Sequence, residues 1–175
     1  MMEFRLSGSG GQGLILAGII LAEAAIGDDK EAVQSQSYGP EARGGSSKSE
    51  VIISEEPIQY PKVINPDFVL AMTQEALNKY GGDLKEDGVL LVDSTFVKEV
   101  PDTFRHVYSV PITKIAKEQL GRELFANIIA LGSVAKLTRA VSSGALERAV
   151  LARVPKGTEE ANKLALELGF SSIKL

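Results

Sequence analysis

The residues best suited to chemistry lie near the amino terminus, in a glycine-rich turn between a predicted strand and a predicted helix. Residues 8–13 read GSGGQG, and Gly8, Gly10 and Gly13 satisfy the pattern G-x-G-x-x-G. Glycines let backbone N–H groups approach an anion closely, and the N-terminus of a helix carries about half a positive charge. We therefore predict a phosphate or pyrophosphate site in this turn, formed by Gly8, Gly10, Gly11, Gln12 and Gly13.

The pattern does not identify the ligand. A nicotinamide site needs an acidic residue about 20 positions further on, at the end of the second strand, to bind the ribose. Gln34 and Gln36 occupy that region instead, so the ribose partner is missing. A second interpretation also stands, in which Gly10, Gly11 and Gly13 only let the first helix pack tightly on the sheet.

A second loop, at residues 35–46, reads SQSYGPEARGGS and is longer than a simple hairpin turn requires. Arg43 offers a planar fork for a carboxylate or phosphate, so we predict that it binds ligand or faces a partner. Tyr38 has the apolar ring and polar tip of a common interface anchor. The predicted subunit interface comprises Ser37, Tyr38, Gly39, Glu41, Arg43, Gly44 and Gly45. The alternative is a solvated loop with a local pair between Glu41 and Arg43.

Length and composition indicate an ordinary globular protein. A chain of 175 residues is long enough for a good core, and we expect one domain over residues 1–175. The formal net charge of −4 argues against a nucleic-acid partner. The longest apolar run, near residues 128–135, is broken by Gly132 and Ser133, so we expect no membrane span. No secretory signal is visible, and we expect a cytoplasmic protein.

The reactive side chains are few. The chain has no cysteine, which excludes disulfides and thiolate-bound iron–sulfur clusters within it. Its one histidine, His106, lies in a predicted strand, where a structural or surface role is the commoner one. We therefore predict no metal site and no catalytic residue in this chain.

Hydrophobic patterns and turn signals predict alternating strands and helices. The predicted strands cover residues 4–7, 31–37, 47–54, 67–72, 88–93 and 106–110. The predicted helices cover residues 11 to about 26, 73–80, 112–120, 125–138, 142–152 and 158–168, with N-caps at Ser142 and Thr158. The second and third strands are too close in sequence for a crossover helix, so we expect them to be antiparallel.

This order predicts a three-layer α/β/α sandwich with a mostly parallel, Rossmann-like sheet and one antiparallel strand. Ligands in such folds bind outside the carboxyl ends of the strands. We expect four segments at that edge: the glycine turn, the loop after Ser37, the turn at Thr73 and residues 93–95.

Taken together, GSGGQG at 8–13, SQSYGPEARGG at 35–45, SEVIIS at 49–54 and FANIIALGSV at 125–134 resemble the gamma subunit of the 2-oxoacid:ferredoxin oxidoreductases. The segment QSYGPEARGG is most similar to the 2-oxoglutarate branch of this family, whereas the branched-chain 2-oxoacid and pyruvate branches carry variants of it. The resemblance covers essentially the whole chain.

The resemblance implies a complex that converts a 2-oxoacid and coenzyme A (CoA) to an acyl-CoA and CO₂ and passes two electrons to ferredoxin. It implies alpha, beta and ferredoxin-like delta subunits, with thiamine diphosphate, magnesium and iron–sulfur clusters held outside this chain. Residues 8–13 would then bind a phosphate of CoA, and Arg43 would bind a second phosphate or position the carboxylate-bearing side of a partner. Asn127 would cap a helix or contact ligand, or serve only as a structural amide.

Three other interpretations remain at this point. The chain is a stand-alone dinucleotide-binding oxidoreductase, a purely structural subunit whose glycine loop holds no ligand, or a subunit for another acceptor branch such as indolepyruvate. The sequence does not distinguish 2-oxoglutarate from a branched-chain 2-oxoacid or pyruvate. Apolar surface that awaits a partner also predicts self-association when the chain is isolated.

Overall fold

A computed structural model describes residues 1–38 and 45–175, apart from the side chain of Tyr38. In this part of the chain the strands form one six-stranded sheet in the order β2-β3-β1-β4-β5-β6. The strands are β1 (Met2–Ser9), β2 (Glu31–Tyr38), β3 (Ser46–Ser54), β4 (Phe68–Ala71), β5 (Val89–Asp93) and β6 (His106–Val110). All six strands expected from the sequence are therefore present, with boundaries shifted by at most two residues.

One strand runs against the others, as predicted. β3 lies between β2 and β1 and is antiparallel to both, with Ser49 opposite Gln36 on one side and Leu6 on the other. The remaining neighbours, β1–β4, β4–β5 and β5–β6, are parallel. The short connection between β2 and β3 enforces this reversal because a parallel pair needs a longer crossover.

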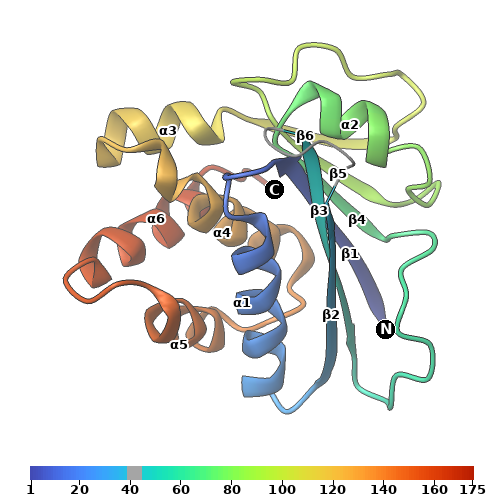
Figure 1. Cartoon of the computed structure of the whole chain (residues 1–175), viewed down its shortest axis with the longest axis horizontal. Coiled ribbons are helices and arrows are strands. Elements are labelled where there is room, and N and C mark those ends of the chain that lie inside the picture. The colour runs from blue at the N-terminus through green and yellow to red at the C-terminus, as the bar shows by residue number, and fades with distance from the viewer. Residues whose placement is uncertain (39–44) are drawn as a thin grey trace.

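Helices cover both faces of the sheet, which confirms the three-layer architecture (Figure 1). The helices are α1 (Leu14–Gly27), α2 (Gln74–Tyr80), α3 (Ile112–Leu120), α4 (Ala126–Thr138), α5 (Ser143–Arg153) and α6 (Glu159–Ser171), with a 3₁₀ turn η1 (Glu123–Phe125). Helices α1 and α3–α6 lie on one side of the sheet, and α2 lies on the other (Figure 1). The central strands are buried on both faces, which explains their continuous apolar runs.

Alternate residues of each central strand face the two cores. In β4, Phe68 and Leu70 belong to the large core beneath α1 and α4, whereas Val69 and Ala71 belong to the smaller core beneath α2. The period of two is the ordinary consequence of the pleat. Most of the buried apolar surface is thus on the side of the sheet that carries α1.

Two local predictions need correction. The first helix begins at Leu14 and not at residue 11, because Gly11 and Gly13 have φ angles of +90° and +74°, outside the range of a right-handed helix. Ser142 caps α5 as predicted and accepts a hydrogen bond from the amide of Ala145. Thr158 does not cap α6, because its hydroxyl donates to the carbonyl of Pro155 instead.

The position of α4 is set by an unusually close contact with α6. A Cβ atom added to Gly132 would lie 2.4 Å from the carbonyl oxygen of Leu166, and one added to Gly169 would lie 2.1 Å from that of Ile129. Ser133 donates a hydrogen bond to the carbonyl of Gly169 across the same contact. Only glycine allows the two backbones to approach this far.

Candidate functional site

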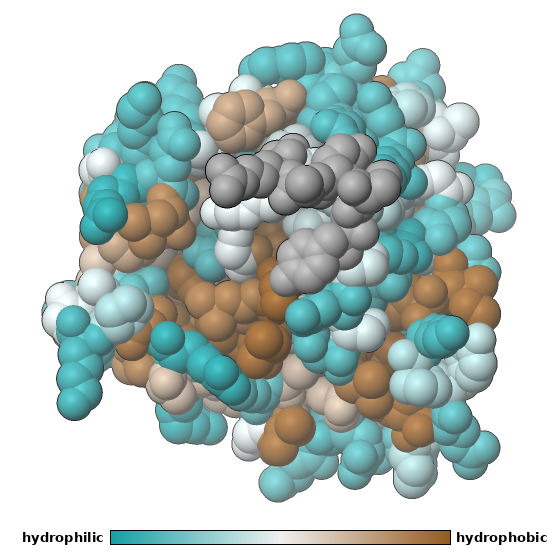
Figure 2. Space-filling model, in the orientation of Figure 1, coloured by the Kyte–Doolittle hydropathy of each residue, from teal (hydrophilic) through white to brown (hydrophobic). Residues whose placement is uncertain are grey.

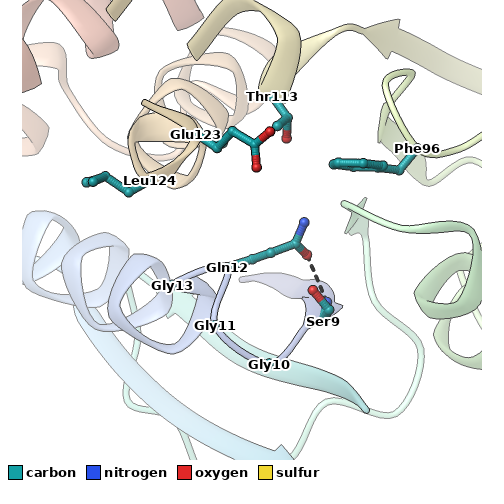
Figure 3. A pocket seen from close by; sticks show the side chains of 10 residues that line it. Ser9, Gly10, Gly11, Gln12, Gly13, Phe96, Thr113, Glu123 and Leu124 are labelled. Atoms are coloured by element: carbon teal, nitrogen blue, oxygen red, sulfur yellow. Dashed lines mark hydrogen bonds between the residues drawn. The ribbon is translucent and has the colours of Figure 1, made fainter. Parts of the chain in front are cut away.

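The glycine loop is the continuation of β1 over the carboxyl edge of the sheet, before α1 begins (Figure 3). The amide of Gly10 donates to the carbonyl of Gly45 at 2.9 Å, which ties the loop to the start of β3. The side chain of Gln12 folds back, and its Oε1 accepts from the amide of Ser9 at 2.8 Å. The loop is therefore held from two directions before any ligand binds.

The positions in the loop are occupied by glycine for different structural reasons. A Cβ on Gly8 would lie 2.3 Å from Oε1 of Gln12, and one on Gly13 would lie 2.5 Å from Nδ2 of Asn127. These two positions are glycine because their surroundings leave no room, so of the three glycines in the packing interpretation only Gly13 is crowded. At Gly11, whose φ is +90°, a Cβ would meet nothing within 4 Å. At Gly10 the nearest atom would be the carbonyl oxygen of Gly45, at 3.8 Å.

A cleft of about 530 Å³ opens above the loop (Figure 3). It is lined by Ser9, Gly10, Gly11, Gln12, Gly13, Phe96, Thr113, Glu123, Leu124 and Ala126. Four of the five residues predicted from the glycine pattern therefore line one cleft. Gly8 lies in β1 beneath it and packs against Gln12.

The far walls of the cleft come from segments that follow β5 and β6. Asp93, the last residue of β5, is fully buried and accepts from the amide of Thr95 at 3.0 Å. Its other oxygen accepts from the hydroxyl of Thr113 at 2.5 Å. Asp93 thus joins the two segments that carry Phe96 and Thr113. The turn at Thr73, also expected near the site, caps α2 and is not among the described lining residues.

Sequence reasoning missed Phe96, Thr113, Glu123 and Leu124. No motif surrounds these four residues, and they come from three separate segments: Phe96 after β5, Thr113 in α3, and Glu123 with Leu124 in η1. The one available signal was topological, because Phe96 directly follows β5 and Thr113 directly follows β6, and such segments meet at the carboxyl edge of a parallel sheet.

The cleft is acidic where side chains line it. Glu123 is the one charged residue among the described lining residues. Phe96 and Leu124, which are 43% and 54% exposed, provide apolar surface on either side. An anion in this cleft would therefore rely on backbone amides and on cations from outside the described lining.

Asn127 supports the loop from behind. It is only 6% exposed, and its Nδ2 donates to the carbonyl of Gly13 at 3.2 Å. The carbonyl of Gly13 also accepts from Ala17 at 3.0 Å. The described contacts of Asn127 are thus to the loop backbone, and any contact with a ligand remains a prediction.

The second loop lies largely outside the described residues. Gly39, Glu41, Arg43 and Gly44 all fall in residues 39–44, so the roles predicted for them stay predictions. The segment leaves β2 after Ser37 and Tyr38 and returns at Gly45, beside the glycine loop.

The start of β3, which follows this loop, is held by side chains on the α2 side of the sheet. The hydroxyl of Tyr80 donates to the carbonyl of Ser46 at 3.3 Å. Nearby, the buried Arg5 donates to Glu50 at 3.0 Å and pairs with Asp83. Burial alone lowers the pKa of Arg5, but its hydrogen bond to Asp83 and the charges of Glu50 and Asp83 outweigh this, so the pKa lies above its ordinary value.

Two kinds of feature are absent from the described residues, a metal-binding cluster and a membrane-spanning helix. Among residues 1–38 and 45–175, no group of three or more Asp, Glu or His side chains is placed to hold a metal ion. Over the same ranges, no helix has the length and apolarity that crossing a bilayer requires.

Comparison with known proteins identifies the family. The family described as Pyruvate ferredoxin/flavodoxin oxidoreductase matches residues 3–172. The 2-oxoglutarate synthase subunit KorC of Methanocaldococcus jannaschii is 53% identical over 175 residues, covering 98% of this chain and 94% of that protein. The keto/oxoacid ferredoxin oxidoreductase gamma subunit of Geobacter sulfurreducens has a solved structure that is 54% identical, with a TM-score of 0.90 and 98% of each chain covered.

A more distant structure shares the fold alone. It is the 2-oxoglutarate:ferredoxin oxidoreductase of Magnetococcus marinus, solved with 2-oxoglutarate, coenzyme A and succinyl-CoA bound. It is 22% identical with a TM-score of 0.84, and the match covers 97% of this chain and 30% of that longer one.

The chain belongs to the pyruvate ferredoxin/flavodoxin oxidoreductase family. Within that family it is a gamma subunit of a 2-oxoacid:ferredoxin oxidoreductase, similar to 2-oxoglutarate synthase subunit KorC. The resemblance noted in the glycine turn and the second loop is thereby confirmed.

Proposed function

We propose that this chain binds the phosphates of CoA at its glycine loop within a 2-oxoglutarate:ferredoxin oxidoreductase, and supports a thiamine diphosphate site held by partner subunits. The observation that carries the proposal is Gly11, whose φ is +90° and whose surroundings are open on the side of the missing Cβ. Packing accounts for Gly8 and Gly13, whereas Gly11 needs glycine for its left-handed φ and, unlike the equally open Gly157, lies in the wall of the cleft. An open glycine in a cleft is what close approach of a ligand to the backbone requires.

The loop offers donors to such a ligand. Within the described residues, no acceptor is present for the amides of Gly11 or Gly13. They precede α1, a helix of 14 residues, so its positive end adds to their field. Backbone amides and a helix N-terminus together suit a phosphate or pyrophosphate.

The cleft side chains make this site dependent on further cations. Because Glu123 disfavours a second negative charge nearby, a bound phosphate needs a positive group that the described lining does not provide. We assign that role to Arg43, or to a basic side chain of the partner subunit that covers the cleft.

The partners are alpha, beta and ferredoxin-like delta chains that carry thiamine diphosphate, magnesium and the iron–sulfur clusters, in a cytoplasmic complex. Surface character supports a docking role. Helix α1 has one charged residue, Glu23, and its Ile26 is 58% exposed. Figure 2 shows apolar side chains gathered over α1. Such surface on a single chain is typical of an interaction face.

The assignment of 2-oxoglutarate as the 2-oxoacid rests on the similarity to KorC and on the sequence of the second loop. The proposal for CoA is also consistent with Gln34 and Gln36, which lie in β2 where a nicotinamide site needs a carboxylate.

Gly11→Asp in the reconstituted complex tests the proposal. The new carboxylate would project into the cleft and repel the phosphates of CoA, so we expect the KM for CoA to rise at least tenfold. Gly157→Asp is the matched control, because Gly157 has a φ of +92°, is equally open and lies between α5 and α6. Both variants carry the same backbone strain of about 1–2 kcal/mol, so their melting temperatures should fall by similar amounts.

An unchanged KM for CoA in Gly11→Asp, with the complex intact, would refute CoA binding at this loop. Calorimetry distinguishes the stand-alone alternative, because near-stoichiometric NAD or FAD binding by the isolated chain would favour a dinucleotide site.

A further inference from the structure

The amide of Gln12 is fixed in orientation by the loop itself. Its Oε1 accepts from the amide of Ser9 at 2.8 Å and lies against Gly8, where a Cβ would come within 2.3 Å of it. Because the Ser9 amide can only donate, Oε1 must face it, and the Nε2 end then points into the cleft (Figure 3). Gln12 therefore presents two N–H donors to whatever lies above the loop.

The opposite wall presents acceptors. The carboxylate of Glu123 points into the cleft across from Gln12 (Figure 3). Beside it, Thr113 uses its hydroxyl hydrogen on Asp93, so only the lone pairs of that hydroxyl remain for a ligand. Phe96 and Leu124 flank this wall with exposed apolar surface.

We propose that this polarity fixes the direction in which CoA lies in the cleft. Gln12 donates to a phosphate oxygen at the glycine loop, and Glu123 accepts an N–H of the pantetheine arm. The inference rests on the proposed function and extends it to the side chains that orient the ligand. The phosphates cannot face Glu123 without like-charge repulsion, whereas the neutral arm has amide N–H groups that a carboxylate binds well. Phe96 and Leu124 contact the apolar part of the same arm.

Two isosteric substitutions test each end separately. Gln12→Glu keeps the oxygen that accepts from Ser9 but replaces the two donors by a second carboxylate oxygen. Glu123→Gln removes the charge of the acceptor wall with little change in shape. Glu147→Gln is the matched control, because Glu147 is exposed on α5 and is not among the described residues that line the cleft.

The intact complex is assayed with two probes. One is CoA, measured by its KM. The other is 3′-phospho-ADP, the nucleotide half without the pantetheine arm, measured by its Ki as a competitive inhibitor. We expect Gln12→Glu to raise both constants at least tenfold. We expect Glu123→Gln to raise the KM for CoA about tenfold, the effect of one charge-assisted hydrogen bond, while the Ki stays the same or falls.

Three results would overturn the inference. One is a fall of both constants in Glu123→Gln, which would place the phosphates at that wall. Another is a rise of both in Glu123→Gln, which would place the nucleotide there. The third is no effect of Gln12→Glu. The proposed function has its own test, because it fails if the KM for CoA is unchanged in Gly11→Asp. If that KM rises while one of the three results above is found, CoA binding at the loop stands and only the proposed orientation is wrong.

Discussion

The contact between Gly13 and Asn127 allows a quantitative test of how the loop is held. In Gly13→Ala, a residue with a Cβ must adopt φ +74°, which costs about 1–2 kcal/mol. The new Cβ would also lie 2.5 Å from Nδ2 of Asn127, and overpacking of this kind adds about 1–3 kcal/mol. We therefore expect the free energy of unfolding to fall by about 2–5 kcal/mol.

Asn127→Ala alone should be milder. It removes one hydrogen bond, worth about 1 kcal/mol, and the carbonyl of Gly13 keeps its bond from Ala17. In the double variant the Cβ at position 13 would meet only the Cβ at position 127, at 3.6 Å, which is ordinary van der Waals contact. The overpacking cost disappears, whereas the backbone strain and the loss of the Asn127 hydrogen bond remain.

The double variant should thus lose about 1–3 kcal/mol less than the sum of the two single losses. Urea denaturation of the four purified chains, with equal m-values, measures this coupling. Additivity within about 0.5 kcal/mol would refute the reasoning, because it would mean that the buried amide of Asn127 moves aside without cost.

Two further predictions concern the scaffold. Gly169→Ala should destabilise the chain by about 3 kcal/mol or more, because the new Cβ would collide with the backbone carbonyl of Ile129, which cannot move aside as a side chain can. The exposed Gly82→Ala is the control. A fall in melting temperature no larger than that of the control would contradict the close α4–α6 contact. Burial raises the pKa of Asp28, but hydrogen bonds from Ser142 outweigh it, so the pKa lies below its ordinary value. The stability that this pair contributes is therefore present above about pH 4 and lost as the pH falls through the lowered pKa. In urea titrations, Asp28→Asn should lower the free energy of unfolding by about 1 kcal/mol at pH 7 and by progressively less below pH 4. An equal loss of unfolding free energy at pH 3 and pH 7 would argue against a stabilising role of the ionised Asp28 carboxylate.

The order of strands and helices and the presence of a glycine turn before α1 were predictable from the sequence alone. Both are local properties, because an apolar run with period two or 3.6 and a cluster of glycines specify conformation within a few residues. The reversal of β3 was also predictable, since residues 39–45 are too few for a crossover. The family, too, was predictable from the glycine turn and the second loop.

Tertiary structure decided which residues share the cleft. Phe96, Thr113 and Glu123 come together only because β5 and β6 are parallel to β1 and end at the same edge. It also separated the glycines by role, since Gly13 faces a side chain 114 residues away and Gly11 faces open space. Neither distinction is visible in the letters GSGGQG, because steric room at a Cβ depends on atoms that only folding brings near.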